Sequence, residues 1–416
     1  MRVIISIFCG RKDRTSILLP YLDRLYAQGD IHEVHLWDYC RAESDREWFR
    51  SLDAPILYTC PSFKYSPFRP CQSPTFTYKF KVKSTSDILT LFVDQNGQEW
   101  ELVIGGWGNT MSGFRRGQHT EPIAQTKSGE HLINTEQTTT DVSISWDAST
   151  PTVTVVVNGQ TPWIIQIQDR TEPLNFVKVA HSSWSTSDCI WNVDEHPPAT
   201  PYRLCCPLDN NTYQWNSHYK FYWKQRDTTY KDTIIVKCDD DIVAIDTDHF
   251  KDFIAFRKAH PEFLLVFPNI VNNGVAAYFQ QNEAHVIPKE MGDLSMPPDG
   301  FCGNLWESAE ICSNLHNYFL NNPSRFSYSS PEYHIIPVPI RFSINLFAIL
   351  PQHLHVFEEA GTADDENYLT VESCIKNNMK KAIYTGMYVS HFSFYSQEAG
   401  MDVPGLLKRY AELANK

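Results

Sequence analysis

The 416-residue chain has no apolar run that approaches the roughly 20 residues of a membrane span. Only a short apolar stretch occurs near its start, at residues 3–8, and charged residues follow at once at 11–14. A secretion signal needs a basic start, a longer apolar core and a small-residue cleavage site, so this segment is predicted to be a buried strand. We therefore expect a cytoplasmic protein with no transmembrane segment.

The chain also lacks an excess of positive charge. It carries 36 lysine and arginine residues against 49 aspartate and glutamate residues, which gives a formal net charge of −13. General nucleic-acid binding depends on a basic surface that displaces counterions, so we expect no nucleic-acid partner. A local basic pocket for a phosphorylated ligand remains compatible with this balance.

The cysteines lack the spacing of a zinc site. Eleven are spread along the chain, and no Cys-x-x-Cys pair occurs among them. An odd number of cysteines in a long chain with no export signal indicates that most are reduced thiols.

A change in composition divides the chain. Residues 75–192 contain 17 threonines, whereas the other 298 residues contain 11. Apolar and polar residues alternate through this segment, for example at 142–146, and Asn158-Gly159 is a strong hairpin-turn signal. The sequence therefore predicts an inserted all-β sandwich over 75–192, between a first domain part at 1–74 and a second at 193–416.

The flanking parts alternate between strands and helices. An apolar strand at 1–8 precedes helical spacing of apolar residues at 15–28, where Gly29 suits the helix end. Beyond the insert, residues 233–236 and 263–267 are expected to be strands on either side of a helix at 250–259. This alternation is typical of an α/β fold with a mostly parallel, layered sheet.

Three consecutive carboxylates, Asp239, Asp240 and Asp241, follow the expected strand at 233–236. They repel one another, so a positive group must neutralise them, and a divalent cation does this well. Ligands of open α/β sheets bind at the carboxyl ends of strands, which is where this triplet lies. The alternative is a charged turn on the surface.

A second acidic cluster, Asp364-Asp365-Glu366, precedes an expected helix at 367–380. Such carboxylates often cap a helix or interact with its dipole, and the first of them, Asp364, is the expected cap. The functional interpretation is a general base, with Asp365 favoured over Glu366.

A histidine, His391, follows an apolar strand at 382–389 near the end of the chain. A lone histidine is more often structural than a ligand. Imidazole can nevertheless join two carboxylates around Mn²⁺ or Mg²⁺, and Mn²⁺ accepts nitrogen more readily. We therefore predict that Asp239, Asp241 and His391 converge at one metal site.

The segment Phe8-Cys9-Gly10-Arg11 follows the first strand and opens a helix. Glycine permits close approach of the backbone, and a helix N-terminus favours phosphate. At the end of the second strand, Trp37-Asp38 could stack a base and hold a ribose, although a buried tryptophan is the alternative.

In their order, these segments resemble a GT-A-fold glycosyltransferase. The similarity is closest to a group of glycosyltransferase-like proteins, and it rests on residues 5–11, 21–23, 29–31, 33–38, 235–241 and 267–274. It covers roughly 1–72 and 197–416. The insert between the second strand and the Asp triplet departs from the minimal fold without breaking it.

The resemblance implies transfer of a sugar from a nucleoside-diphosphate sugar to a hydroxyl of a glycan, protein or small-molecule acceptor. Asp239 and Asp241 match the Asp-x-Asp pattern that binds Mn²⁺ or Mg²⁺ and the diphosphate, with His391 as a further ligand. Asp365 or Glu366 would deprotonate the acceptor if the reaction inverts configuration. The nucleotide side would be formed by Phe8, Cys9, Gly10, Arg11, Asp38, Lys237 and Asp240.

The insert has a resemblance of its own. Residues 80–83, 104–110, 112–115, 144–146 and Trp184 are similar to the domain named after farnesoic acid O-methyltransferase. A methyl-donor site usually needs a glycine-rich turn between a strand and a helix, whereas Gly105-Gly106-Trp107-Gly108 lies in a β-only stretch. We interpret the insert as a binding or interaction module, in which Trp107 or Trp184 either stacks on sugar rings or packs in the fold.

Two other functions stay open. A non-catalytic carbohydrate- or protein-binding protein would use the sandwich for recognition, but the acidic triplet and the late histidine disfavour it. A nucleotidyltransferase shares the layered fold and the metal carboxylates, but its glycine-rich basic loop is poorly matched by residues 8–12.

Overall fold

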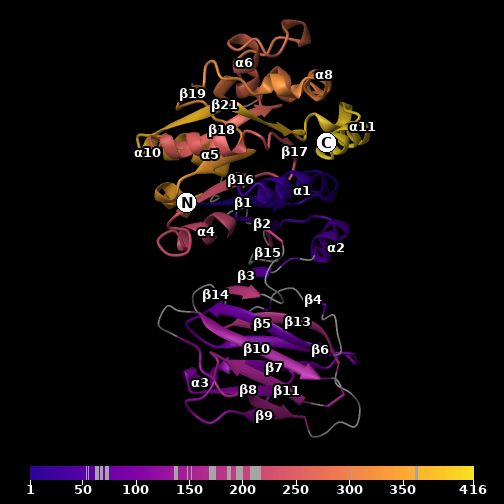
Figure 1. Ribbon diagram of the computed structural model, residues 1–416, viewed down its shortest axis with the longest axis vertical. Coiled ribbons are helices and arrows are strands. Elements are labelled where there is room, and N and C mark those ends of the chain that lie inside the picture. Colours follow the sequence, from indigo (N-terminus) through magenta and orange to yellow (C-terminus); the bar gives the residue numbers. More distant parts are fainter. Residues whose placement is uncertain are drawn as a thin grey trace. The chain divides into compact units, whose positions relative to one another are not determined.

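The computed structural model of the chain contains two compact units (Figure 1). Unit 1 comprises Met1–Phe49 and Gln214–Lys416, and unit 2 comprises Arg50–Tyr213. The residues that the structure describes are 1–52, 54, 56–60, 65, 69–70, 75–134, 139–147, 149–150, 152–167, 175–184, 189–193, 200–206, 217–300, 302–360 and 364–416.

A mixed sheet forms the centre of unit 1. Its strand order is β2 (Glu33–Asp38), β1 (Arg2–Cys9), β16 (Thr233–Cys238), β20 (Leu346–Ile349), β18 (Phe263–Val271), β21 (Lys380–His391) and β17 (Ile242–Ile245), with β19 (Tyr333–Ile336) also paired to β21. β1 is parallel to β2 and β16, and β18 is parallel to β21.

The expectation of a mostly parallel sheet is corrected, because β17, β19 and β20 run antiparallel to their neighbours. The reason is clearest at β17. Only residues 239–241 separate it from β16, far fewer than the dozen or more that a crossover between parallel strands needs. The chain therefore reverses at the acidic triplet, and β17 pairs with β21 instead.

Helices surround this sheet. The helix α1 (Lys12–Ala27) buries Ile17, Leu18, Leu22 and Leu25, contacts β17 and α11, and ends before Gly29, whose φ is 78°. The remaining helices of unit 1 are α2 (Glu43–Ser51), which ends in unit 2, α4 (Ser217–Lys224), α5 (Phe250–Ala259), α6 (Gly274–Asn282), α7 (Asn304–Glu307), α8 (Ala309–Asn321), α9 (Asp365–Asn367), α10 (Ser373–Lys376) and α11 (Val403–Ala414).

Short helical turns occur at Lys289–Met291, Pro298–Gly300, Pro323–Phe326, Pro351–Glu358 and Glu398–Gly400, and a π-helical turn at Tyr368–Glu372 joins α9 to α10. The helix expected at 367–380 is thus placed differently. Helical structure begins at Asp365 and ends at Lys376, and Lys380 already belongs to β21.

Unit 2 is a β-sandwich, as predicted. One sheet has the order β12 (Trp163–Gln166), β11 (Thr152–Val157), β10 (Thr140–Asp147), β5 (Thr75–Lys83), β14 (Cys189–Val193), β3 (Ile56–Cys60) and β15 (Tyr202–Cys206). The other has the order β4 (Arg69–Pro70), β13 (Phe176–Ser183), β6 (Ile88–Asp94), β7 (Glu99–Gly105), β8 (Met111–Arg116) and β9 (Pro122–Gln125). A short turn, α3 (Gly106–Asn109), joins β7 to β8.

Aromatic rings from both sheets form the core of unit 2. The ring of Phe176 lies 4.8 Å from that of Phe92 and 4.4 Å from that of Trp146, measured between centroids. Unit 2 extends beyond the predicted insert of 75–192, because β3 and β15 belong to one of its sheets. Within the described residues of the whole chain, no helix is long and apolar enough to cross a membrane.

Candidate functional site

The strand order of the sheet in unit 1 reverses at β1. The chain passes from β1 through α1 to β2 on one side, whereas β16 pairs with β1 on the other side. In open α/β sheets, ligands bind beyond the carboxyl ends of the strands at such a topological switch point. The loops that leave β1 and β16 there contain Gly10, Arg11 and the acidic triplet.

The two loops are in direct contact. The backbone N–H of Gly10 donates a hydrogen bond to Oδ2 of Asp240 over 2.9 Å. A Cβ atom at position 10 would lie 2.9 Å from the same oxygen, closer than Cβ atoms pack in proteins. Glycine at this position therefore permits the approach of the β1 loop to the β16 loop.

Arg11 forms ion pairs with two members of the triplet. Its Nη2 lies 2.6 Å from Oδ1 of Asp240 and 2.9 Å from Oδ2 of Asp241, and its Nε donates to Oδ2 of Asp240. Burial alone would lower the pKa of Arg11, but the two carboxylates outweigh burial and raise that pKa. The guanidinium is therefore a permanent positive charge between these acids.

The third acid, Asp239, pairs with a different cation. Its Oδ1 accepts a hydrogen bond from Nζ of Lys237, which also donates to the carbonyl of Ile344 over 2.6 Å. Burial raises the pKa of Asp239 to about 6, although Lys237 acts in the opposite direction. Its side chain is nevertheless 27% exposed, so a ligand at the edge of the sheet can reach this carboxylate.

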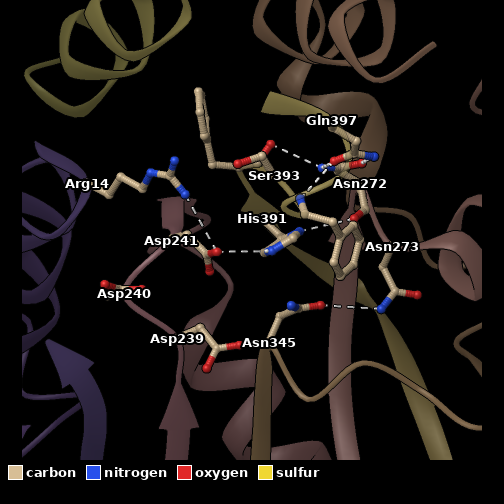
Figure 2. Close-up of polar contacts among 12 residues, drawn as sticks. Arg14, Asp239, Asp240, Asp241, Asn272, Asn273, Asn345, His391, Ser393 and Gln397 are labelled. Atoms are coloured by element: carbon tan, nitrogen blue, oxygen red, sulfur yellow. Dashed lines mark hydrogen bonds and ion pairs between the residues drawn. The ribbon is translucent and has the colours of Figure 1, made fainter. Parts of the chain in front are cut away.

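His391 reaches the triplet from the end of β21 (Figure 2). Its Nε2 lies 3.3 Å from Oδ2 of Asp241, and its Nδ1 lies 3.2 Å from the carbonyl oxygen of Asn272. A carbonyl can only accept, so Nδ1 carries the hydrogen and Nε2 faces the carboxylate. A hydrogen bond from the other ring nitrogen to a backbone carbonyl, like that of Nδ1 here, orients the histidines that bind metals in proteins.

Asp241 is the most constrained acid of the triplet. Burial alone would raise its pKa, but His391, Arg11 and Arg14 outweigh burial and hold the pKa well below the usual range. Its Oδ2 faces all three of these groups. Its Oδ1 is buried and has no hydrogen-bond partner among the described residues.

A network that the sequence did not reveal supports Asp241. Arg14 is 3% exposed, lies 2.6 Å from Glu398 and 3.9 Å from Asp241, and its guanidinium sits over the ring of Phe392. Arg11 precedes α1 in an extended conformation and Arg14 lies in its first turn, so helical spacing did not indicate that they meet at one acid. Nor did the sequence indicate Glu398, which is 384 residues from Arg14.

Asparagine side chains fix the strand that delivers His391. Asn272, with a φ of 60°, donates to the carbonyl of Phe392 and is paired with Gln397. Asn273 approaches Asn345, whose carbonyl accepts the N–H of Asp239 (Figure 2). The sequence placed Asn272 and Asn273 in a motif without giving them a role.

Of the residues predicted to line the nucleotide side of the site, some have side chains that are buried or already paired. The ring of Phe8 lies 4.7 Å from that of Tyr39 and 4.1 Å from that of His218. Asp38 accepts the N–H of Cys40 and lies 3.8 Å from Arg46. The side chain of Cys9 is fully buried, so only its backbone can face a ligand. Trp37 is buried too and donates to Ser6.

The second acidic cluster divides into three roles. Asp364 is the N-cap of α9, as predicted, and its Oδ1 accepts the N–H of Asn367. Glu366 is paired with Nε of Arg341, and burial raises the pKa of this carboxyl. Asp365 instead accepts a hydrogen bond from the hydroxyl of Tyr219 over 3.1 Å.

Tyr219 is affected by both acidic clusters. Burial is the main cause that raises the pKa of its hydroxyl, and the charges of Asp365 and Asp239 raise it further. Both carboxylates therefore lie within electrostatic range of one phenol. Asp365 is the member of its cluster whose partner, Tyr219, packs against Phe8 of β1, with the ring centroids 6.4 Å apart.

The geometry fits a cation in part. No group of three or more His, Cys, Asp or Glu side chains that could hold a metal occurs in the described ranges of the chain. Asp241 and His391 meet, whereas Asp239 faces Lys237. The buried, unpartnered Oδ1 of Asp241 is a vacant oxygen donor, and carboxylate with imidazole suits Mn²⁺. The roles assigned to these residues stay predictions.

Comparisons with known proteins concern part of the chain. A family model described as farnesoic acid O-methyl transferase matches residues 59–197, which supports the resemblance noted for the insert. No curated protein matches the sequence. The turn at Gly105-Gly106-Trp107-Gly108 joins two antiparallel strands, β7 and β8, as the sequence indicated.

Three solved structures illustrate the matches found. Domains LG4-5 of the mouse laminin alpha1 chain match with 12% identity and a TM-score of 0.24, covering 36% of this chain and 45% of that one. A tetrameric galectin from the ball sponge Cinachyrella sp. matches with 10% identity and a TM-score of 0.24, over 32% and 94% of the two chains. A Bacillus subtilis protein with a galectin-like fold matches with 10% identity and a TM-score of 0.25, over 37% and 90%.

Proposed function

We propose that unit 1 is a metal-dependent glycosyltransferase that moves a sugar from a nucleoside-diphosphate sugar to an acceptor hydroxyl. The observation that carries this proposal is the state of Asp241. It lies at the switch point of the sheet, its Oδ2 is faced by Arg11, Arg14 and His391, and its buried Oδ1 has no partner among the described residues. Buried polar atoms are nearly always paired, so an unpaired one at a strand end favours a ligand.

The surroundings of Asp241 suit a diphosphate. The helix α1 begins directly after Arg11, whose side chain does not cap it, and a helix N-terminus favours negatively charged groups. The N–H of Lys12 there already donates to Oδ1 of Asp45 over 3.0 Å. Arg11 is 39% exposed, so its side chain is accessible to a ligand. Planar guanidinium groups bind phosphate oxygens in pairs, which orients the leaving group.

A cation would be held by Asp241 and His391, with Asp239 as a third donor, and would supply positive charge against the diphosphate as it leaves. The protein contributes the remaining steps through its own side chains. Asp365 would accept the proton of the acceptor hydroxyl, while Tyr219 donates to its other oxygen and holds it in place. Glu366 is less suited to this role, because Arg341 already occupies it.

The first experiment measures donor binding and donor breakdown. Thermal shifts with UDP-, GDP- and other sugar nucleotides, each with and without Mn²⁺, should reveal one donor that stabilises the protein only with the metal. Hydrolysis of that donor should release a nucleoside diphosphate and free sugar. Conversion of that donor, with added pyrophosphate, into a nucleoside triphosphate and a sugar phosphate would instead identify a nucleotidyltransferase.

A histidine pair provides the matched variants. His391→Gln should weaken the Mn²⁺-dependent shift, because Nε2 faces Asp241, whereas His355→Gln should leave it unchanged. His355 is exposed and bonded to Asn377, away from the triplet. Equal shifts in the two variants would remove His391 from the metal site, and the absence of any metal-dependent shift in the unmodified protein would reject the proposed activity.

We propose a second function for unit 2, the binding of a sugar. Trp107 is 44% exposed and adopts a left-handed φ of 52°, which is rare for an aromatic residue. Its ring lies over Gly113, where a Cβ would come within 2.7 Å of the indole. Strained exposed residues often belong to ligand sites, and a flat indole suits the face of a sugar ring. We do not propose methyl transfer, because the glycine turn joins antiparallel strands.

Glycan-array binding tests this second function. Trp107→Ala should lower the retention of any glycan that binds the protein, whereas Ile164→Ala should not, although Ile164 is 60% exposed on the other sheet. Identical profiles for both variants would assign Trp107 to packing alone.

A further inference from the structure

Arg11 and a divalent cation compete for the same carboxylates. Its Nη2 lies within 2.9 Å of oxygens from both Asp240 and Asp241, so a cation bound to Asp241 must share or displace this guanidinium. Two positive charges that share one carboxylate repel one another. The arrangement thus opposes metal binding as long as Arg11 stays where it is.

We propose that Arg11 is an exchangeable internal cation, which neutralises the acidic triplet in the free protein and moves to the donor diphosphate when a divalent cation takes Asp241. This inference rests on the proposed function of unit 1. It assigns to Arg11 a role in coupling the metal to the diphosphate, in addition to the phosphate contact that the sequence suggested.

The neighbours of Arg11 make this exchange feasible. Arg11 is 39% exposed, whereas Arg14 is 3% exposed and fixed by Glu398 and the ring of Phe392. Nη1 of Arg11 already lies 3.9 Å from the same Glu398, so a second anion is available within a short movement. Arg11 is therefore the accessible partner of the triplet, and Arg14 is the enclosed one.

The acids also keep partners when Arg11 leaves. Asp240 retains the N–H of Gly10, and Asp241 retains His391. Arg14 has its Nε and Nη1 without hydrogen-bond partners among the described residues, and Nη1 lies 3.9 Å from Oδ2 of Asp241. The departure of Arg11 thus removes one of the three groups that face Oδ2 of Asp241, without leaving the triplet uncompensated.

Separate titrations of the full chain test the exchange with simple probes. Mn²⁺ alone, followed by calorimetry or by the loss of its free electron-spin-resonance signal, reports on the carboxylates. Inorganic pyrophosphate in the presence of EDTA reports on the anion side. Arg11→Met should bind Mn²⁺ alone about tenfold more tightly or better, because the competing charge is gone, and should bind pyrophosphate about tenfold more weakly.

Two further variants guard against loss of folding. Arg11→Lys keeps the charge with fewer donors and should fall between the unmodified protein and Arg11→Met in both titrations. Arg409→Gln, in α11, removes an arginine bonded to Asn317 and Asn321 and should change neither. Mn²⁺ should also raise the melting temperature of Arg11→Met more than that of the unmodified protein.

The outcomes separate this inference from the proposed function. If Arg11→Met and the unmodified protein bind Mn²⁺ with equal affinity, and Asp241→Asn does not bind it, the metal site stands and the exchange is overturned. Weaker Mn²⁺ binding in Arg11→Met would also overturn it, since Arg11 would then support the site. No Mn²⁺ binding to any variant would reject the proposed function and the exchange together.

Discussion

Each unit buries a carboxylate against an arginine, and the two pairs differ in completeness. In unit 2, Glu101 on β7 accepts from Arg115 through one oxygen and from Tyr65 through the other. In unit 1, Asp241 faces Arg11, Arg14 and His391 through Oδ2, while its buried Oδ1 has no partner among the described residues.

This difference distinguishes a structural ion pair from a candidate ligand site. Glu101 is fully buried and both its oxygens are paired, so nothing remains for a ligand to satisfy. Asp241 sits among more cationic groups and still has a free oxygen. The number of charges near a buried acid is thus a poor guide to function, and the unsatisfied atom is a better one.

Paired substitutions test this comparison with the largest expected effect. Asp241→Asn should lower metal-dependent donor turnover by several orders of magnitude, because it removes an ionic oxygen donor. Glu101→Gln should leave turnover unchanged and destabilise unit 2 by about 3 to 5 kcal/mol, since it leaves Arg115 uncompensated. Donor assays and thermal unfolding of both variants provide the two readouts. Loss of turnover in Glu101→Gln at temperatures where it is folded would contradict the distinction.

Asp365 offers the next largest effect. Asp365→Asn should lower turnover by roughly 10²- to 10⁴-fold, the usual contribution of a positioned base, while donor and Mn²⁺ binding persist. Tyr219→Phe should give a smaller loss, because the phenol only holds the carboxylate in place. Near-normal turnover in Asp365→Asn would leave the base unassigned.

A buried cation outside the site gives a pH-dependent prediction. Lys381 on β21 is fully buried, and its ammonium donates to the carbonyls of Pro337, Val338 and Thr370. Burial lowers its pKa to about 8, below the value of 10.5 for an unperturbed lysine. Between pH 8 and pH 10.5, Lys381 is protonated in the unfolded chain and neutral in the folded one. The free energy of unfolding should therefore rise with pH over this range, by up to about 3 kcal/mol.

Lys381→Met isolates this effect. The difference in unfolding free energy between the unmodified protein and the variant should change from pH 8 to pH 10.5 in favour of the unmodified protein. Chemical denaturation at a series of pH values measures it. A difference that is constant with pH would show that Lys381 keeps an ordinary pKa in the folded state.

The sequence predicted the features that depend on local pattern. The helix α5 has the expected bounds, because Phe250, Phe253 and Ile254 recur with helical spacing and are buried. The hairpin signal at Asn158-Gly159 connects β11 to β12, with both residues at positive φ. The cap at Asp364 was predicted because capping involves only the next few residues.

Features that depend on distant contacts were not predictable. Nothing near Glu366 indicated its pairing with Arg341, and nothing near Arg14 indicated Glu398. The burial of Cys9 was missed for another reason. β1 is buried on both faces, so period-two alternation does not show which of its side chains point toward a ligand. The antiparallel return of β20 likewise depends on pairing with β16 and β18.

The smallest expected effect concerns the helix cap beside the proposed base. Asp364 is 47% exposed, caps Asn367 and lies 2.7 Å from Arg341. Asp364→Ala should cost about 1 kcal/mol of stability, the usual value for a lost N-cap, and should leave turnover within a few-fold of normal. Arg341 keeps Glu366 as a partner, so the start of the helix stays near Tyr219. Melting curves and donor assays together decide the point: a turnover loss as large as that of Asp365→Asn, at unchanged stability, would make Asp364 the base and reduce Asp365 to a structural partner of Tyr219.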